Sequence, residues 1–173
     1  MANFTKSWRA EVGLNHTPAY QVSGRPFASA SCLAPASGGA DGSAITLRVQ
    51  FPQVTRWFQI IPSGAATVPH SLRVGFSKHG VSDPPAAGGA ADGLRGGNYF
   101  KLYVPHFSGP AAVDGAAPMA AGQRYEMKVS ELHFMSDDAA TVTFDIVAGL
   151  TNIPSSRLET DDGPNYSGSR GVG

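Results

Sequence analysis

The sequence is poor in charge: Asp, Glu, Lys and Arg make up 15% of its 173 residues, where about 25% is usual in soluble domains. Basic and acidic residues number 13 each, so the formal net charge is zero, and no run of Lys or Arg occurs. Because nucleic-acid binding normally needs a basic surface to neutralise phosphates, the composition argues against a nucleic-acid partner. So little charge also leaves weak repulsion between copies, which favours a surface buried against partners.

Disulfides and long apolar stretches are also missing. The single cysteine, Cys32, excludes an internal disulfide, and its small apolar neighbours are typical of a packed strand residue rather than a reactive thiol. No stretch approaches 18 consecutive apolar residues, so we expect no direct insertion into a membrane. The first twelve residues contain Lys6, Arg9 and Glu11 and no apolar centre, which is unlike a secretory signal.

Glycine and proline are abundant instead. With 21 Gly and 13 Pro they form about a fifth of the chain, and they divide it into short apolar runs. This spacing is typical of an all-β sandwich or barrel, and no long helical pattern interrupts it. The expected strands are residues 19–23, 26–33, 44–51, 54–61 (ended by Pro62), 71–77, 98–104, 124–135 and 141–148, about eight in all.

The segment 124–135 is the ambiguous one. Apolar residues alternate from Tyr125 to Val129, and the phase then slips because Leu132 and Phe134 have the other parity. A β-bulge near residues 130–131 would return both sets to one buried face. Helix is the competing interpretation, because part of the segment also has helical spacing; we favour a strand.

The two ends of the chain differ from its middle. We expect an N-terminal arm at 1–17, one sandwich domain at 18–154 and a flexible C-terminal tail at 155–173. Aromatic residues on otherwise polar arms are candidate anchors in a partner's groove. The predicted assembly contacts are Phe4, Trp8 and Tyr166. Loops are expected at 34–42, 82–97 and 105–122, and whether the last two bind receptor, glycan or neighbouring subunits stays open.

No pattern of catalytic chemistry emerges. The histidines (His16, His70, His79, His106 and His133) have no metal-ligand spacing, and neither a nucleophile elbow nor a phosphate-binding glycine loop is present. Glu126 and Glu131 form a possible acid–base pair of a glycosidase, but nothing else supports that pairing. We therefore expect no enzyme activity, no metal and no cofactor.

Several segments, in order along the chain, resemble the small single-jelly-roll capsid proteins of large icosahedral double-stranded DNA viruses. The longest is 13–27, which reads GLNHTPAYQVSGRPF. The others are FPQVTR at 51–56, LRVGFS at 72–77, NYF at 98–100, SDD at 136–138 and AGLTNIP at 148–154. Together they cover about a third of the chain, and no single one of them is diagnostic.

The resemblance implies a penton, or another minor capsid protein, with an eight-stranded antiparallel jelly-roll sandwich and extended arms. It implies a homopentamer at the capsid vertex of the virion, assembled in the host cell, whose partners are neighbouring major and minor capsid proteins. It implies no catalytic residues. The alternative is a carbohydrate-binding sandwich, a receptor-binding or lectin-like module, which would expose Trp57, or Tyr99 and Tyr103 in a row.

Overall fold

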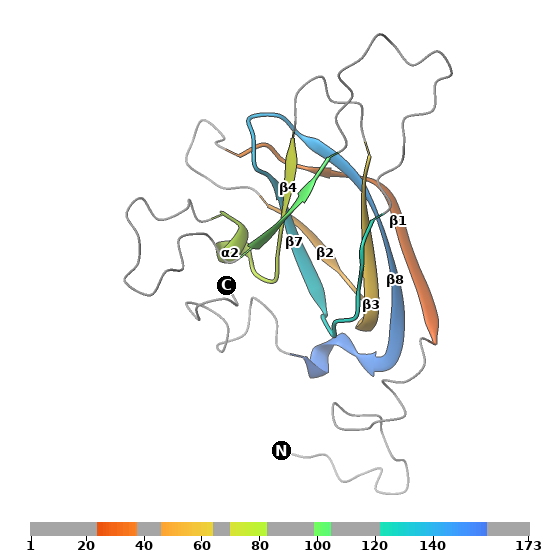
Figure 1. Ribbon diagram of the computed structural model, residues 1–173. Coiled ribbons are helices and arrows are strands. Elements are labelled where there is room, and N and C mark those ends of the chain that lie inside the picture. Colours follow the sequence, from red (N-terminus) through yellow and green to blue (C-terminus); the bar gives the residue numbers. More distant parts are fainter. Residues whose placement is uncertain (1–23, 38–45, 64–69, 83–98, 105–121, 159–173) are drawn as a thin grey trace, which may run out of the picture.

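The computed structural model describes residues 24–37, 46–63, 70–82, 99–104 and 122–158. They form two antiparallel four-stranded sheets that face each other as a β-sandwich (Figure 1). The strands are β1 (Arg25–Ala34), β2 (Leu47–Gln50), β3 (Gln53–Ser63), β4 (Ser71–Gly75), β5 (Tyr99–Tyr103), β6 (Arg124–Tyr125), β7 (Glu131–Ser136) and β8 (Val142–Pro154). A short helix α2 (Lys78–Ser82) and a 3-10 turn η2 (Ser155–Arg157) complete the described elements. The all-β sandwich predicted from the sequence is therefore confirmed.

Strands that are far apart in the chain lie side by side in each sheet. The strand orders are β1-β8-β3-β6 and β2-β7-β4-β5. Among the strands that the structure describes, the first pairs with the last, the second with the seventh, the third with the sixth and the fourth with the fifth. Because β1 runs antiparallel to β8, with Arg25 opposite Leu150, the chain enters and leaves the sandwich at the same end.

The core lies between the two sheets and is built from the alternating residues of each strand. Phe134 on β7 and Phe144 on β8 meet across it, with their ring centroids 4.4 Å apart. Phe58 and Phe100 both contact the Tyr125 ring, at 5.3 and 5.2 Å between centroids, and close one side of the sandwich. The alternation predicted for residues 71–77, 98–104 and 141–148 is confirmed, because its apolar set faces this core.

Two strand ends differ from the prediction. Strand β3 does not stop before Pro62: it continues to Ser63, with Pro62 opposite Phe144. Proline has no N–H to donate to a neighbouring strand. It is tolerated at this position because, in the described residues, β6 pairs with β3 only at Phe58 and Gln59, so no residue of β6 lies opposite Pro62. Strand β8 extends past residue 148 to Pro154, since β1 and β3 pair with it on both sides.

The segment 124–135 is not one bulged strand, and that prediction is wrong. Residues 124–125 form β6 in one sheet and residues 131–136 form β7 in the other, so the chain changes sheets between them. Thr55 secures the crossing: its hydroxyl lies 2.8 Å from the Met127 carbonyl oxygen and 3.0 Å from the Val129 amide nitrogen. The phase slip in the sequence marks this change of sheet. The two sheets face the same core from opposite sides, so the apolar residues of β6 and β7 must point in opposite directions.

Edge strand β1 contains an irregularity. The register with β8 shifts between Ser29 and Cys32, and Ser31 takes a left-handed conformation with φ of 55°. The Ser31 N–H donates to the Asp145 carboxylate at 2.7 Å, which holds the bulge in place. The expected strand at 19–23, most of the loops at 82–97 and 105–122, and the arm at 1–17 lie outside the described residues. The domain boundaries therefore stay a prediction.

Candidate functional site

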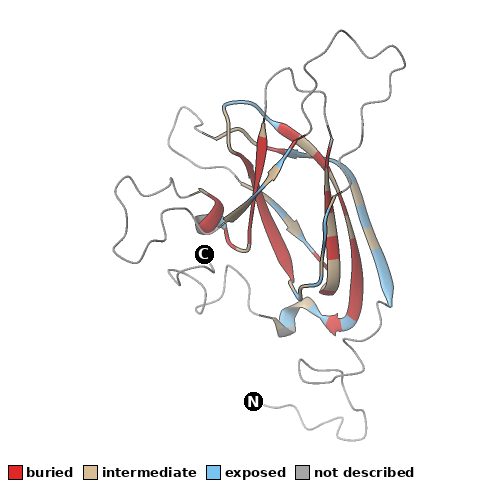
Figure 2. Ribbon diagram, viewed as in Figure 1, coloured by how far each residue is buried: buried red, intermediate tan, exposed pale blue. Residues whose placement is uncertain are grey.

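The outer face of the β2-β7-β4-β5 sheet is unusual because it is covered and charged. Strands β4 and β7 are buried along their whole length (Figure 2), although alternate residues of each must point away from the core. Helix α2 contacts both strands. The charged residues of this face gather into two clusters, one around Asp137 and the other around Glu131.

The Asp137 cluster joins three strands. Arg73 Nε donates to Asp137 Oδ1 at 2.6 Å, and Lys101 Nζ donates to Oδ2 at 2.5 Å. The Ser71 hydroxyl also donates to Oδ2, at 3.1 Å. The Arg73 guanidinium lies 4.8 Å from the centroid of the Tyr99 ring and is only 9% exposed. The cluster thus ties β4 and β5 to the end of β7.

The charges of this cluster set the pKa of Asp137. Burial by itself would raise that pKa, but the hydrogen bonds from Lys101 and Arg73 outweigh it and hold the pKa of Asp137 below its ordinary value of 3.8. The same hydrogen bond raises the pKa of Lys101, and burial opposes that rise. Because the folded pKa of Asp137 is depressed, its stabilisation is complete above pH 3.8 and is lost as the pH falls through the folded pKa.

We expect Asp137→Asn to lower the free energy of unfolding at pH 7 by about 2 kcal/mol, because hydrogen bonds from two cations lose their charged acceptor. Below pH 4, the free energy of unfolding of the variant should also fall less steeply than that of the parent chain. Urea unfolding at pH 7, 4 and 3 measures both effects. The matched control is Asp138→Asn, whose carboxylate is 44% exposed and contacts His70 at 3.2 Å; it should cost less than about 1 kcal/mol. An acid profile of Asp137→Asn identical to that of the parent chain would contradict the role assigned to the cluster.

The Glu131 cluster lies on β2 and β7. Arg48 donates twice to Glu131 Oε2, from Nε at 2.9 Å and from a terminal nitrogen at 2.6 Å. His133 Nε2 lies 3.3 Å from the other carboxylate oxygen. The side chains of Glu131 and His133 are each 3% exposed, so this contact is buried. Buried charges require such partners, and the arrangement fixes Glu131 as a structural carboxylate.

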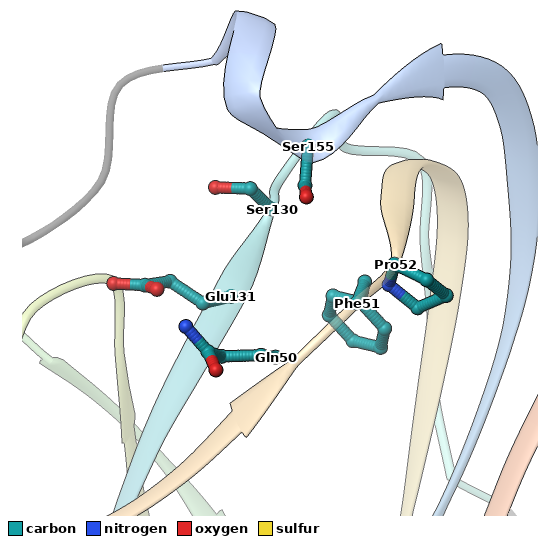
Figure 3. A pocket seen from close by; sticks show the side chains of 6 residues that line it. All are labelled: Gln50, Phe51, Pro52, Ser130, Glu131 and Ser155. Carbon is teal, nitrogen blue, oxygen red and sulfur yellow. The ribbon is translucent and has the colours of Figure 1, made fainter.

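A shallow pocket of about 330 Å³ opens beside Glu131, at the end of the sandwich where β2 stops and β7 starts (Figure 3). We call it the end pocket. Phe51 and Pro52 form its apolar wall, and the hydroxyls of two serines lie across from them (Figure 3). Its lining residues are Gln50, Phe51, Pro52, Ser130, Glu131 and Ser155. This volume is at the lower limit of ligand pockets, roughly 300–1,000 Å³.

The site residues predicted from the sequence are placed only in part. The predicted assembly contacts Phe4, Trp8 and Tyr166 lie outside the described residues, as do His16 and His106. Within the described part of the chain, no group of three or more His, Cys, Asp or Glu side chains is arranged to hold a metal.

The carboxylates considered for glycoside hydrolysis are engaged by different arginines. Glu126 is 54% exposed and pairs with Arg124 at 2.6 Å and with Arg56 at 3.7 Å. Glu131 is buried against Arg48. Each carboxylate thus serves an ion pair of its own, one on the surface and one in the interior.

The three aromatic residues of the carbohydrate-binding alternative do not share one face. Trp57 lies on β3 in one sheet, and the Arg124 guanidinium stacks 4.4 Å from its ring centroid. Tyr99 and Tyr103 lie on β5 in the other sheet. Arg73 covers the Tyr99 ring, whereas Tyr103 is 76% exposed. Tyr103 is therefore the aromatic side chain among these that is open to a ligand.

Neither the two charged clusters nor the end pocket is predicted by the sequence. Arg73 lies on the outer face of β4, and its burial beneath α2 carries no signal in a local pattern. Asp137 is followed by Asp138 in a short polar stretch that is typical of a turn. The clearest available sign was the position of Glu131 within a strand whose other residues are mostly apolar, because an unpaired carboxylate does not occupy such a place.

None of the helices in the described residues is long and apolar enough to cross a membrane. Comparison of the chain with protein-family models, with curated proteins and with solved structures found no significant match.

Proposed function

We propose that this chain is a structural capsid protein: a jelly-roll penton that closes the five-fold vertices of a large icosahedral virion. The pairing of strands carries the proposal. Strand β1 pairs with β8, β2 with β7, β3 with β6 and β4 with β5. A long hairpin that is rolled into two sheets would give this pattern of pairs. We infer from this pairing an eight-stranded jelly roll, an architecture used by viral capsid and lectin domains.

Two further features support a role in assembly. The zero net charge and low charge content leave little repulsion between copies of the chain. The sandwich begins at Arg25 and ends at Pro154 on the same end, so the terminal segments with Phe4, Trp8 and Tyr166 start from one side of the domain. Head-to-tail contacts between five copies form a closed ring, because each copy is rotated by a fifth of a turn relative to the next. In such a ring, both arms of each copy would extend to the same layer of neighbours.

The proposal predicts that the purified chain forms a homopentamer and that its density occupies the vertices of intact particles. Sedimentation velocity measures the first, and electron cryo-microscopy of virions measures the second. Removing residues 1–12 should leave the circular dichroism spectrum of the sandwich unchanged and should reduce incorporation into particles. A monomer at all accessible concentrations, or density elsewhere than at the vertex, would overturn the proposal.

A carbohydrate-binding module is the second candidate, favoured by one observation: Tyr103 is 76% exposed and shares a strand face with Lys101 and Tyr99. An aromatic face beside a cation can stack on a sugar ring. A glycan-array screen separates the two functions. Binding that is lost in Tyr103→Ala, in a chain that does not form pentamers, would establish the second candidate in place of the first.

A further inference from the structure

The side of the sandwich where β5 and β6 face each other is closed by side chains. These two strands belong to different sheets, and in the described residues β6 pairs with β3 only at Phe58 and Gln59. Three partly buried rings meet on this side: the centroid of Phe100 lies 5.2 Å from that of Tyr125 and 6.5 Å from that of Phe76. We call these three rings the aromatic seam.

Strand β5 is held less firmly than its neighbour β4. It has five residues and pairs with β4 alone among the described strands. Its inward residues Phe100 and Leu102 are partly buried, whereas the residues opposite them on β4, Val74 and Leu72, are fully buried. Elements with few buried apolar contacts and few backbone hydrogen bonds open locally at a low cost in free energy. These features favour local opening of β5.

The other edge of the same sheet is anchored differently. Strand β2 is shorter, but it leads directly into Phe51, which is buried in the core and whose N–H donates to the Ser130 carbonyl oxygen at 2.9 Å. Arg48 of β2 also bonds twice to the buried Glu131 carboxylate. Strand β2 is therefore fixed by the core as well as by its own ladder.

A charged contact ties the outer face of β5 to the rest of the sheet. Lys101 is the central residue of β5, and its Nζ donates to the carboxylate of Asp137, which directly follows β7. Because β4 lies between β7 and β5, this ion pair reaches across a strand. Arg73 and Ser71 of β4 donate to the same carboxylate. Separation of β5 from β4 therefore breaks the bond from Lys101 and leaves the two bonds from β4 in place.

We propose that β5 is a detachable edge strand: it separates from β4 while the remaining strands stay folded, and the Lys101–Asp137 ion pair is the latch that holds it closed. Detachment exposes the aromatic seam and leaves the backbone donors and acceptors of β4 without their β5 partners. The sandwich thus contains a hidden apolar surface on one side. The inference concerns a single chain and does not depend on the proposed capsid role.

Native-state hydrogen exchange of the full-length chain, followed by NMR at pH 7, tests the opening. The amides of Leu102 and Val104 report on β5, since the Val104 N–H donates to the His70 carbonyl oxygen at 2.9 Å. After correction for intrinsic exchange rates, these amides should exchange at least about tenfold faster than that of Ile146 on the doubly paired strand β8, and low urea should barely change their rates. Equal rates and equal urea dependence for the two strands would overturn the inference.

Two substitutions of Lys101 test the latch. Lys101→Met removes the charge and should speed exchange at Leu102 and Val104 about threefold to tenfold, because the Lys101 side chain is 40% exposed and solvent partly screens its ion pair. Lys101→Arg keeps a cation beside Asp137 and should return these rates to within about twofold of the parent chain. Circular dichroism confirms that both variants are folded. Unchanged exchange in Lys101→Met, or an acceleration of the same size in Lys101→Arg, would contradict the role of the ion pair as a latch.

Discussion

Replacing Phe134 with alanine should lower the free energy of unfolding by about 3–5 kcal/mol, the range expected when a large buried aromatic side chain is truncated. Phe134 is fully buried on β7, between Leu47 of β2 and Val74 of β4, and its ring meets Phe144 of the opposite sheet at 4.4 Å between centroids. Alanine leaves a cavity that the flanking strands cannot fill, because both are held in register by their own ladders. Urea unfolding followed by circular dichroism measures the loss.

The control for this substitution is Leu33→Ala. Leu33 is as apolar as a core residue but is 55% exposed on edge strand β1, so its truncation should change stability by no more than about 0.5 kcal/mol. Phe134→Leu provides a measurable intermediate if the alanine variant does not fold. A loss below 1 kcal/mol in Phe134→Ala would mean that the two sheets do not pack face to face as described.

Gly122→Ala should cost about 1–3 kcal/mol, near the upper limit for an overpacked site. A Cβ atom at position 122 would lie 2.0 Å from the Ile60 carbonyl oxygen and 2.8 Å from its carbonyl carbon. Both are backbone atoms of β3, so relief requires moving the strand or losing the hydrogen bond from Gln59 Nε2 to the Gly122 carbonyl oxygen, 2.6 Å long. Thermal unfolding monitored by circular dichroism gives the change in melting temperature.

Gly24→Ala is the matched control for that change. A Cβ atom there would approach the side-chain oxygen of Asn152 at 3.2 Å, and Asn152 is exposed and free to rotate away. The melting temperature of Gly24→Ala should therefore stay within a degree or two of the parent, about the shift expected from a few tenths of a kcal/mol. Equal melting temperatures for the two glycine variants would show that Gly122 does not approach β3 as closely as described.

The strands were largely predictable because their signal is local. Alternation in residues 71–77 and 141–148 reports directly which side chains face a core. The segment 124–135 shows where that signal ends: a slip in phase is compatible with a bulge and with a change of sheet, and only tertiary pairing decides between them. The end of β3 could not be predicted locally either. Pro62 can belong to β3 because the neighbouring strand β6 is short, and the length of β6 is a tertiary feature.

The charged clusters and the end pocket could not be predicted from the sequence. Arg73 and Asp137 are 64 residues apart, and Arg48 and Glu131 are 83 apart, so their pairing follows from the order of strands rather than from any local pattern. The end pocket likewise joins residues near 51, 130 and 155. Each of these residues is ordinary in its own segment, and their chemistry appears only when the two sheets bring the segments together.

The register shift in β1 interrupts a strand at the edge of its sheet, as far as the described residues show. A straight ten-residue strand at the rim of a sheet is a template onto which a further strand from another molecule can add, and such growth has no natural limit. Pro26 lacks an amide proton, and the left-handed turn at Ser31, clasped by Asp145, breaks the row of backbone groups a few residues later. A bulge and a proline of this kind are among the features by which proteins limit open-ended strand addition at the edge of a sheet.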